Sequence, residues 1–434
     1  MINYYFNYYF NIILILLINQ IYFSLSYIEY YVEKTTIKEK LHNYQNLQYF
    51  GSIYVGSNFK KFSVIFDTGS NLLWLPSYKC HNCRDSERKF NNLNSETFQN
   101  KNQTKEIIYA KGYVKGSMAN DIVSLNYHRN YTNIKDYVKL NFLLVNDEKD
   151  LNGTMADGVL GLGNNFEGNK HNSFVYQMYL NKIIDKPKFS FVINNISKKS
   201  KIIFGSNNIN YKSNCSITSG LNYWGCRFNK IEIKDESNNV YSSIKGIIND
   251  KDTNNNFNSN TIYSNIAVFD TGSSFYILPY EYMVNIVESI NKYYKSSNMK
   301  CYITEEVNQL VCDCNIHYRN PYFIFYLISD IYYIQQLSIQ FKDMLFFNDY
   351  STNMCYYEAV ASKQLNFFIL GDTILRNLII EFDMENNKIN YVEKHTLNTS
   401  KELEIIYIGR LIIYLGIISV CLLFSLRLIK ILFK

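Results

Sequence analysis

The chain of 434 residues contains little proline, with 4 residues, and little charge, with Asp, Glu, Lys and Arg at 19%. The scarcity of proline excludes a collagen-like chain, and the 47% share of hydrophobic residues argues against a mostly disordered one. The formal net charge of +6 is small for this length, and no stripe of Lys and Arg alternates with aromatic residues. Nucleic-acid binding therefore has little support.

The sequence also lacks the short motifs of several enzyme classes. It contains no Gly-x-Ser-x-Gly or papain-like cysteine motif and no His-Glu-x-x-His zinc motif. These absences disfavour serine, cysteine and metal-dependent mechanisms, and we expect neither a metal nor an organic cofactor. The length itself suggests two or three domains, or one large body with two lobes.

Long hydrophobic runs stand near both ends. Residues 8–26 carry no charged side chain and predict a signal peptide or signal anchor at 1–26, with a buried core helix as the alternative. Residues 405–426 are apolar except for Arg410 and predict one C-terminal transmembrane helix, with an amphipathic packing helix as the alternative. The basic tail at 427–434 favours a cytoplasmic C-terminus. The body is then expected in the secretory lumen, an acidic organelle or outside the cell, on a single-pass type I membrane protein.

The 9 cysteines favour the same compartment. Cys421 lies in the expected transmembrane helix, which leaves eight in the body, an even number typical of disulfides in an oxidising compartment. Eight cysteines allow 105 connectivities, and local spacing favours Cys80 with Cys83 and Cys215 with Cys226. A redox or zinc site at residues 80–83 is a weak rival, because no second close Cys/His pair has ligand spacing. The body cysteines are Cys80, Cys83, Cys215, Cys226, Cys301, Cys312, Cys314 and Cys355.

Short apolar or alternating runs recur through the body, separated by clusters of Asn, Asp, Gly and Ser. Together with the 16% share of aromatic residues, this pattern predicts an all-β body. A helix is expected at 281–294, and the polar, Asn-rich residues 249–260 are expected to form a surface loop. The clearest expected strands are residues 49–56, 62–66, 122–125, 188–193, 202–204, 266–269, 367–370 and 379–382.

One internal repeat relates two halves of the body. Residues 64–70 read Val-Ile-Phe-Asp-Thr-Gly-Ser, and residues 267–273 read Ala-Val-Phe-Asp-Thr-Gly-Ser. A second pattern, two hydrophobic residues followed by Gly, occurs at 159–161 and again at 369–371. Repeated units of this size predict two similar lobes, each of which carries the same loop to a shared cleft.

Two apolar strands that each deliver one carboxylate suggest a chemical task, because such a group is costly to bury without a partner. A plain turn is the alternative for a single copy, but it explains two copies in matching contexts poorly. If the lobes face each other, Asp67 and Asp270 lie close together and share one proton. Such a pair can take a proton from water and give one to a carbonyl oxygen, which hydrolyses an amide without a covalent intermediate. Gly69 and Gly272 permit the turns, Thr68 and Thr271 could brace the loops, and Ser70 and Ser273 lie within reach of the carboxylates.

These residues resemble the pepsin-like aspartic proteases, a family of bilobal β proteins with one central cleft, for which a carboxylate pair sharing a proton is characteristic. The resemblance implies an aspartic endopeptidase with Asp67 and Asp270 as the catalytic pair, polypeptide substrates and a monomeric catalytic body. The composition, rich in Asn, Lys and Tyr, and the short loop between Cys80 and Cys83 resemble those of the plasmepsins of apicomplexan parasites. The similar segments fall between residues 46 and 391 and include 47–51, 66–77, 157–163, 369–376 and 382–389.

The family covers its cleft with a β-hairpin that carries a Tyr, and Tyr109 fits that place without a gap through to Asp121. A rival register uses Tyr113 but needs a deletion afterwards. The resemblance also implies that Trp74 donates a hydrogen bond to this Tyr, with simple core packing as the alternative. The substrate-binding residues implied in this way are Tyr109, Gly69, Ser70, Gly272, Ser273 and Trp74.

By the same resemblance Cys80 pairs with Cys83 and Cys314 with Cys355, which leaves Cys301 with Cys312. The segment before the similar region is far shorter than the usual inhibitory prosegment, so activation by removal of a long propeptide is in doubt. The expected parts of the chain are a signal segment at 1–26, a short prosegment or lead at 27–46, an N-terminal lobe at 47–195, a C-terminal lobe at 196–395, a juxtamembrane linker at 396–404, a transmembrane helix at 405–426 and a tail at 427–434.

The sequence therefore predicts a membrane-anchored aspartic endopeptidase whose C-terminal helix holds it to the membrane. A membrane-tethered peptide-binding protein with the same fold and no activity is the alternative. Intact motifs at both Asp67 and Asp270 argue against it, because a protein that only binds has no physical reason to keep a costly pair of like charges.

Overall fold

The structure is a computed structural model, and it describes most of the body. Contacts divide the chain into two units, Met1–Tyr391 and Val392–Lys434, of which the second is described only at residues 392–394. Among the described residues, no helix is both long and apolar enough to cross a membrane. The expectations for 1–26, 249–260, 396–404, 405–426 and 427–434 lie outside the described residues. These are 36–84, 88–109, 112–129, 131, 135–151, 153–164, 172–193, 200–235, 237–245, 265–330 and 333–394.

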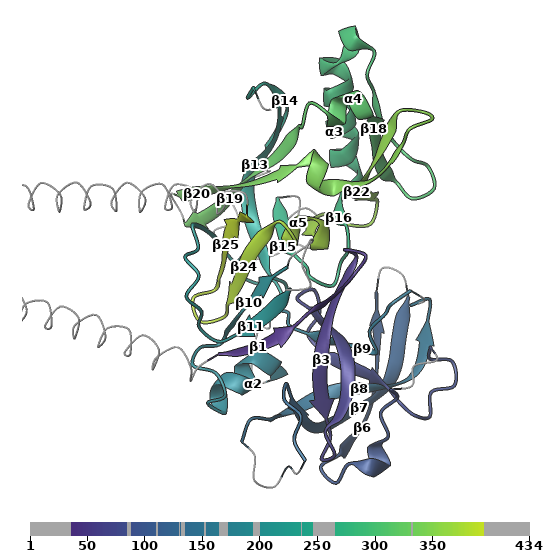
Figure 1. Ribbon diagram of the computed structural model, residues 1–434, viewed down its shortest axis with the longest axis vertical. Helices are drawn as coiled ribbons and strands as arrows, with labels where there is room; N and C mark the ends of the chain where they lie inside the picture. Colours follow the sequence, from purple (N-terminus) through teal and green to yellow (C-terminus); the bar gives the residue numbers. More distant parts are fainter. Residues whose placement is uncertain are drawn as a thin grey trace, which may run out of the picture. The chain divides into compact units, whose positions relative to one another are not determined.

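The strands of the first unit form three sheets (Figure 1). The 8-stranded sheet has the order β2-β3-β4-β9-β5-β8-β7-β6. Its strands are β2 His42–Tyr44, β3 Gln48–Val55, β4 Lys60–Asp67, β5 Leu73–Pro76, β6 Gln99–Ile108, β7 Tyr113–Ser124, β8 Val138–Lys149 and β9 Gly158–Gly161.

The 11-stranded sheet follows the order β17-β18-β22-β16-β23-β15-β13-β19-β20, with β14 paired to β13 and β21 paired to β22. Its strands are β13 Gly225–Lys234, β14 Val240–Lys245, β15 Ile266–Phe269, β16 Tyr276–Pro279, β17 Cys301–Ile303, β18 Gln309–Asp313, β19 Tyr322–Asp330, β20 Tyr333–Gln340, β21 Leu345–Asp349, β22 Met354–Ser362 and β23 Phe368–Leu370.

The 6-stranded sheet, in the order β1-β11-β10-β24-β25-β12, collects strands that are far apart in the sequence. Figure 1 shows purple β1 beside teal β10 and β11, with yellow-green β24 and β25 next to them. The boundary expected between residues 195 and 196 lies outside the described residues, but β10 and β11 on either side of it pair with each other. The strands are β1 Ile37–Lys40, β10 Lys188–Val192, β11 Lys201–Phe204, β12 Ser213–Ser216, β24 Leu378–Asp383 and β25 Lys388–Glu393.

Within the described part of the chain, α3 Tyr280–Tyr293 is the longest helix. In α3, Met283, Ile286 and Ile290 are buried, a spacing that places them on one face of the helix, and Pro279 stands just before its first residue. The expected helix and each of the expected strands have counterparts in the structure. The helices are α2 Phe174–Leu180, α3 Tyr280–Tyr293, α4 Cys314–His317 and α5 Asp372–Leu375, with 3-10 turns at η1 Asn92–Asn94, η3 Lys295–Ser297 and η4 Phe341–Met344.

The strand patterns explain which positions reach the core. In β3, buried residues alternate with partly exposed ones, as expected for a strand with one covered face. The last four residues of β4 are all buried, because β4 lies between β3 and the parallel strand β9. The outer strand β6 has a polar sequence and is almost wholly exposed. The buried end of β4 thus delivers its last residue, Asp67, into the interior.

The segment expected as a short lead, residues 27–46, contributes two strands to the fold. β1 pairs with β11, and β2 pairs with β3. Leu41, between the two strands, is 1% exposed and belongs to the main hydrophobic core. The described part of this segment is therefore built into two sheets.

Candidate active site

The first Asp-Thr-Gly-Ser loop begins where β4 ends. Asp67 is the last residue of β4 and lies beside Gly161 of the parallel strand β9. The Val-Leu-Gly pattern at 159–161 is therefore paired with the residues that lead into the loop. The Gly69 N–H donates to Asp67 Oδ1 at 2.8 Å, and the Ser70 hydroxyl donates to Oδ2 at 2.5 Å. Both carboxylate oxygens are therefore held by the loop's own donors.

The second loop repeats this construction. Asp270 follows β15, which runs parallel to β23, and Phe269 lies beside Leu370 of the Ile-Leu-Gly pattern. The Gly272 N–H donates to Asp270 Oδ1 at 2.8 Å, and the Ser273 hydroxyl donates to Oδ2 at 2.7 Å. The repeat seen in the sequence is thus a repeat of geometry, with the same donors in the same roles.

The two threonines join the loops to each other. The Thr68 N–H donates to Thr271 Oγ1 at 3.0 Å, and the Thr271 N–H donates to Thr68 Oγ1 at 2.9 Å. Each hydroxyl in turn donates to a carbonyl of the opposite half, Thr68 to Phe269 at 2.8 Å and Thr271 to Phe66 at 2.6 Å. Both threonines are buried. Every donor and acceptor in this ring is satisfied only when the two halves are together.

The loops approach each other so closely that only glycine fits at their tips. A Cβ at Gly69 would overlap the Asp270 carboxylate, and a Cβ at Gly272 would overlap that of Asp67. Burial, and then the charge of Asp270, raise the pKa of Asp67 well above its usual range. The two carboxyl groups are also joined by a hydrogen bond. The pair is therefore expected to hold one proton that both groups share.

Tyr109 reaches the carboxylate pair from the end of the β6–β7 hairpin. The Trp74 indole N–H donates to the Tyr109 hydroxyl at 2.8 Å, and Ser70 is a second hydrogen-bond neighbour of that hydroxyl. Burial, and then Asp67, raise the pKa of Tyr109. In contrast, the Tyr113 hydroxyl donates to Asp147 at 3.2 Å.

The structure thus has the register with Tyr109 at the hairpin end. Backbone bonds between Tyr109 and Gly112 close the turn, and the residues at its tip, 110 and 111, lie outside the described residues. Contacts run from Trp74 through Tyr109 and Ser70 to Asp67, and from Gly69 and Gly272 to the opposite carboxylates. All eight predicted catalytic and substrate-binding residues therefore meet at one place, including Asp270 and Ser273.

A buried polar network behind the second loop was missed from the sequence. Asp372 and Thr373 follow Gly371, and their N–H groups donate to the carbonyls of Ser273 at 2.7 Å and Ser274 at 3.1 Å. The Thr373 hydroxyl lies 2.9 Å from a Glu358 carboxylate oxygen, to which Arg376 donates at 2.6 Å.

Burial, and then the charge of Asp270, raise the pKa of Asp372 well above its usual value. One signal could have found this residue. Asp372 follows an apolar strand just as Asp67 ends one, but it lacks the Thr-Gly-Ser that marked the two loops.

The eight body cysteines form four disulfides. The structure joins Cys80 to Cys83, Cys215 to Cys226, Cys301 to Cys312 and Cys314 to Cys355, which are the expected pairs. With this first disulfide formed, neither Cys80 nor Cys83 has a free thiolate that could bind zinc. Within the described residues, no group of three or more His, Cys, Asp or Glu side chains could hold a metal ion.

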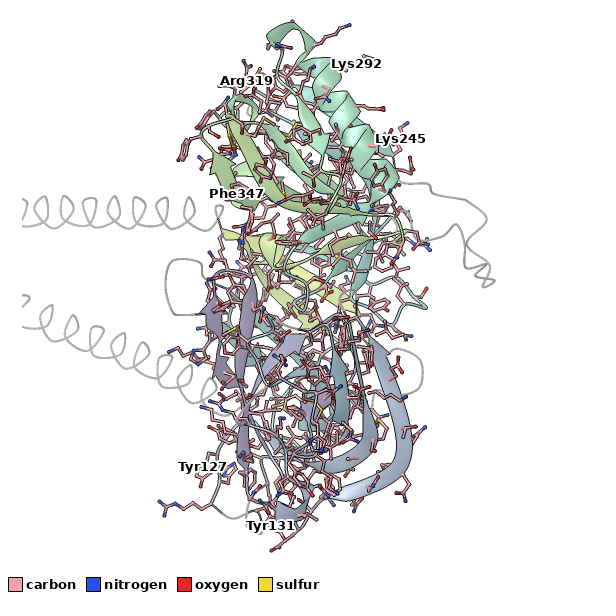
Figure 2. The ribbon with its side chains drawn as sticks, turned by 90° about the vertical axis from the view of Figure 1, so that its right-hand side faces the viewer. Tyr127, Tyr131, Lys245, Lys292, Arg319 and Phe347 are labelled. Atoms are coloured by element: carbon pink, nitrogen blue, oxygen red, sulfur yellow. A yellow bond between two sulfur atoms is a disulfide. The ribbon has the colours of Figure 1, made fainter. Side chains whose placement is uncertain are left out.

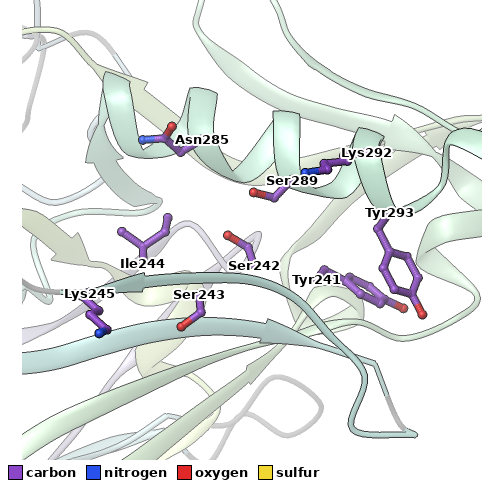
Figure 3. Close-up of a pocket in the computed structure, with 9 residues that line it drawn as sticks. All are labelled: Tyr241, Ser242, Ser243, Ile244, Lys245, Asn285, Ser289, Lys292 and Tyr293. Carbon is purple, nitrogen blue, oxygen red and sulfur yellow. The ribbon is translucent and has the colours of Figure 1, made fainter.

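A separate cavity of about 750 Å³ lies between β14 and α3 (Figure 3). Ser242 and Ile244 point from β14 towards the helix, while Asn285, Ser289 and Lys292 line it from α3. None of the predicted site residues lines this cavity. The carboxylate pair remains the one place where the predicted residues converge.

Comparisons with known proteins agree with the arrangement of these residues. A family model described as eukaryotic aspartyl protease matches residues 48–394. Chymosin of Callithrix jacchus is 41% identical over 90 residues, which are 20% of this chain and 23% of that protein. Pepsin II-1 of Oryctolagus cuniculus is 37% identical over 127 residues, covering 29% of this chain and 31% of that protein.

Plasmepsin I of Plasmodium falciparum is 23% identical over 359 residues, which are 81% of this chain and 70% of that protein. The alignments with chymosin and pepsin II-1, in contrast, span less than a third of those relatives' own lengths. High identity is therefore confined to short segments, and the likeness to plasmepsin I is more distant but extends over most of the body.

Proposed function

Because the chain belongs to the eukaryotic aspartyl protease family, we propose that it is an aspartic endopeptidase that hydrolyses peptide bonds in polypeptides. The observation that carries this proposal is the geometry of Asp67 and Asp270. Two carboxylates from repeated loops face each other, each held by a glycine N–H and a serine hydroxyl. Two like charges held close together in a buried site lower the stability of the fold, and a protein that only binds peptides has no physical reason to keep them.

The chemistry follows from the shared proton. The ionised member of the pair takes a proton from a water molecule, which then attacks the carbonyl carbon of the scissile bond. The protonated member gives its proton to the carbonyl oxygen, so a tetrahedral intermediate forms with no bond to the protein. Proton transfer to the amide nitrogen then lets the C–N bond break. The raised pKa of Asp67 and the hydrogen bond between the two carboxyl groups support a resting pair that holds one shared proton.

The substrate would lie extended across the pair. Its backbone, over roughly seven or eight residues, would pair with the hairpin that ends at Tyr109 and with the loops at Gly69 and Gly272. Tyr109, held by Trp74 and Ser70, would cover the reacting bond and exclude water from it. Apolar side chains on both sides of the cut are expected from the family.

We further propose that residues 405–426 anchor the protein as a single-pass type I membrane protein, with the body in the secretory lumen, an acidic organelle or outside the cell. The four disulfides support an oxidising compartment for the body. The apolar run at 405–426 and the basic residues after it support the anchor and its orientation. Among the relatives named above, plasmepsin I aligns over the largest share of the chain, which supports a plasmepsin-like enzyme.

The activity is tested with the full-length chain and a library of peptides at acidic pH. Wild type should cleave, a pepstatin-type inhibitor should stop cleavage, and Asp67→Ala and Asp270→Ala should each lose roughly 10³-fold or more of the rate. Asp349→Ala, a carboxylate on the exposed β21–β22 turn, is the matched control and should retain activity. Equal cleavage by wild type and both variants would refute the assigned pair, and cleavage by none would favour the peptide-binding alternative.

The topology is tested by protease protection of a tag at the C-terminus in sealed vesicles. In vesicles whose interior corresponds to the lumen, protease added outside should digest a cytoplasmic tail, while the body inside stays protected. A protected tag together with a digested body would reverse the proposed orientation.

A further inference from the structure

A row of aromatic rings, three of them exposed, crosses the 11-stranded sheet. We call it the aromatic row. Phe346 is 49% exposed, Phe347 is 45% exposed and Tyr302 is 43% exposed, although rings of this size are usually covered in a folded protein. Phe347 is among the side chains labelled in Figure 2. The aromatic row consists of Phe275, Phe346, Phe347, Tyr356 and Tyr302.

A β-bulge exposes two consecutive phenylalanines. In the pairing of β21 with β22, Leu345 lies opposite Tyr357 and Phe347 opposite Tyr356, so Phe346 is an extra residue without a partner. In a regular strand neighbouring side chains point to opposite faces, but a bulge changes the direction of one of them. Both Phe346 and Phe347 are exposed as a result.

The aromatic row begins at Phe275, shortly after the loop that carries Asp270. Phe275 follows Asp270 by five positions and packs edge-on against Phe346, with the ring centres 6.4 Å apart. Phe346 and Phe347 are 5.5 Å apart, and Phe347 stacks on Tyr356 at 4.2 Å with the planes 10° from parallel.

Tyr302 continues the row on the neighbouring strands. Val311 lies opposite Tyr302 on one side and opposite Tyr356 on the other, so both tyrosines flank it on the same face of the sheet. Their hydroxyl groups are hydrogen-bonded to each other. The apolar surface is therefore continuous from the second loop to β17.

We propose that the aromatic row is an extended docking surface for an apolar stretch of the polypeptide substrate, outside the residues that lie across Asp67 and Asp270. This inference rests on the proposed function. Its occupant follows from continuity, because the loop that carries Asp270 runs on to Phe275, which is the first ring of the row. The three distances between ring centres from Phe275 to Tyr356 together equal the length of at most about five residues of an extended chain.

The geometry of the rings suits such a role. Rings that pack against one another, edge-on or stacked, are already held in place, so binding to them costs little side-chain entropy. Phe and Tyr offer broad apolar faces, and the hydroxyls of Tyr302 and Tyr356 can meet the polar backbone of a bound strand. Aromatic and branched aliphatic side chains in the substrate would gain most from this contact.

The test compares substrates of two lengths. A short peptide covers only the cleavage site, and two long peptides add five apolar residues, including Phe and Leu, on the N-terminal or the C-terminal side. The full-length wild type should show a KM roughly tenfold lower for one long peptide than for the short one, as expected for burial of one or two rings. The ratio of the KM for the short peptide to the KM for that long peptide should fall towards one in Phe347→Ser and in Tyr302→Ser.

Tyr333→Ser is the matched control. Tyr333 lies on β20 of the same sheet, is 67% exposed and does not belong to the row, so its removal should leave the ratio at the wild-type value. Melting temperatures of the three variants show whether each is folded. A ratio of one in wild type, or an unchanged ratio in both row variants, would overturn the proposal.

Failure of the proposed function would look different. If no peptide is cleaved, fluorescence anisotropy of the labelled long peptide still measures binding, and about tenfold weaker binding by Phe347→Ser would support the row without supporting catalysis. Equal binding by both proteins would refute it.

Two other occupants of the surface have their own outcomes. A concentration-dependent dimer of wild type that Phe347→Ser abolishes, with an unchanged KM ratio, would assign the surface to a second copy of the chain instead. Binding to neutral lipid vesicles lost in that variant, again with an unchanged ratio, would assign it to a membrane.

Discussion

The two Asp-Thr-Gly-Ser loops are alike in their own hydrogen bonds and differ in what surrounds them. In both, a glycine N–H lies 2.8 Å from Oδ1 and a serine hydroxyl holds Oδ2. The first loop is covered by Tyr109, which Trp74 holds, whereas the second is supported from behind by the network of Glu358 and Arg376. The repeat builds a symmetric holder for two carboxylates, and segments outside the repeat make their surroundings unequal.

This difference has a chemical consequence. Two carboxylates in identical surroundings would have no preferred place for a shared proton, whereas unequal surroundings assign it. Asp67 is only 6% exposed, and burial raises its pKa, while Asp270 is more accessible. The inequality of the two loops is therefore part of the proposed mechanism.

The largest effect is expected from breaking the support behind the second loop. Arg376→Met removes the charged partner that donates to the buried Glu358 carboxylate at 2.6 Å, and should lower the free energy of unfolding by about 3–5 kcal/mol. Urea unfolding measures this loss. Lys186→Met is the control, because it removes only an exposed pair with Glu385 and should leave the free energy of unfolding nearly unchanged. Similar losses in both variants would mean that the network does not support the loop.

The next effect tests the symmetry of the threonine ring. Thr68→Val and Thr271→Val each leave a buried carbonyl and a buried N–H unpaired, and each should lower the free energy of unfolding by about 2–4 kcal/mol. The double variant should lose less than the sum of the two, because both belong to one ring. A neutral effect at one position would show that the two halves do not share the ring equally.

A smaller effect concerns pH. Because burial and then Asp270 raise the pKa of Asp67, the folded chain keeps a proton that the unfolded chain releases near its ordinary pKa of about 4. Folding stability contributed by this group is present at low pH and is lost as the pH rises towards the raised folded value. Asp67→Asn removes this loss, so its melting temperature should exceed that of wild type by roughly 2 °C or more near neutral pH. The difference should vanish in acid.

Asp349→Asn is the control with the opposite sign. The hydroxyls of Ser351 and Thr352 lower the pKa of Asp349, so its stabilising effect is present at neutral pH and is lost in acid. This variant should therefore show no gain in melting temperature at neutral pH. A gain in both variants would trace the effect to the overall charge of the protein and not to the carboxylate pair.

Local patterns predicted the strands, helix α3 and the two loops, because each depends on residues that are close in sequence. The network behind the second loop could not be predicted in this way, since Glu358, Thr373 and Arg376 meet only after β22 and α5 pack together. Asp372 stood in a recognisable segment, but its effect depends on a distance to Asp270 that no spacing reveals.

The division expected at 195 and 196 stays a prediction, because both residues lie outside the described residues, but one sheet around it could not be predicted from the sequence. β1 reads Ile-Lys-Glu-Lys, which has too few apolar residues to indicate a strand, yet it pairs with β11 along the 6-stranded sheet. Two repeated loops predicted two lobes, whereas the structure adds a third sheet to which segments before and after residue 195 both contribute. The 6-stranded sheet forms by backbone pairing between distant segments, and such pairing depends little on which amino acids the strands contain.

The smallest effect concerns the cover of the first loop and separates Tyr109 from Tyr113. Tyr109→Phe removes the acceptor of the Trp74 indole N–H at 2.8 Å and the hydroxyl beside Ser70, so kcat/KM should fall roughly 5–10-fold, as for about 1 kcal/mol of lost transition-state stabilisation. Tyr113→Phe loses only a bond to the Asp147 carboxylate at 3.2 Å and should change kcat/KM less than about twofold. Kinetics on one short peptide measure both. An equal fall in the two variants would mean that the hairpin acts through its overall stability, and a larger fall for Tyr113→Phe would reverse the register at the site.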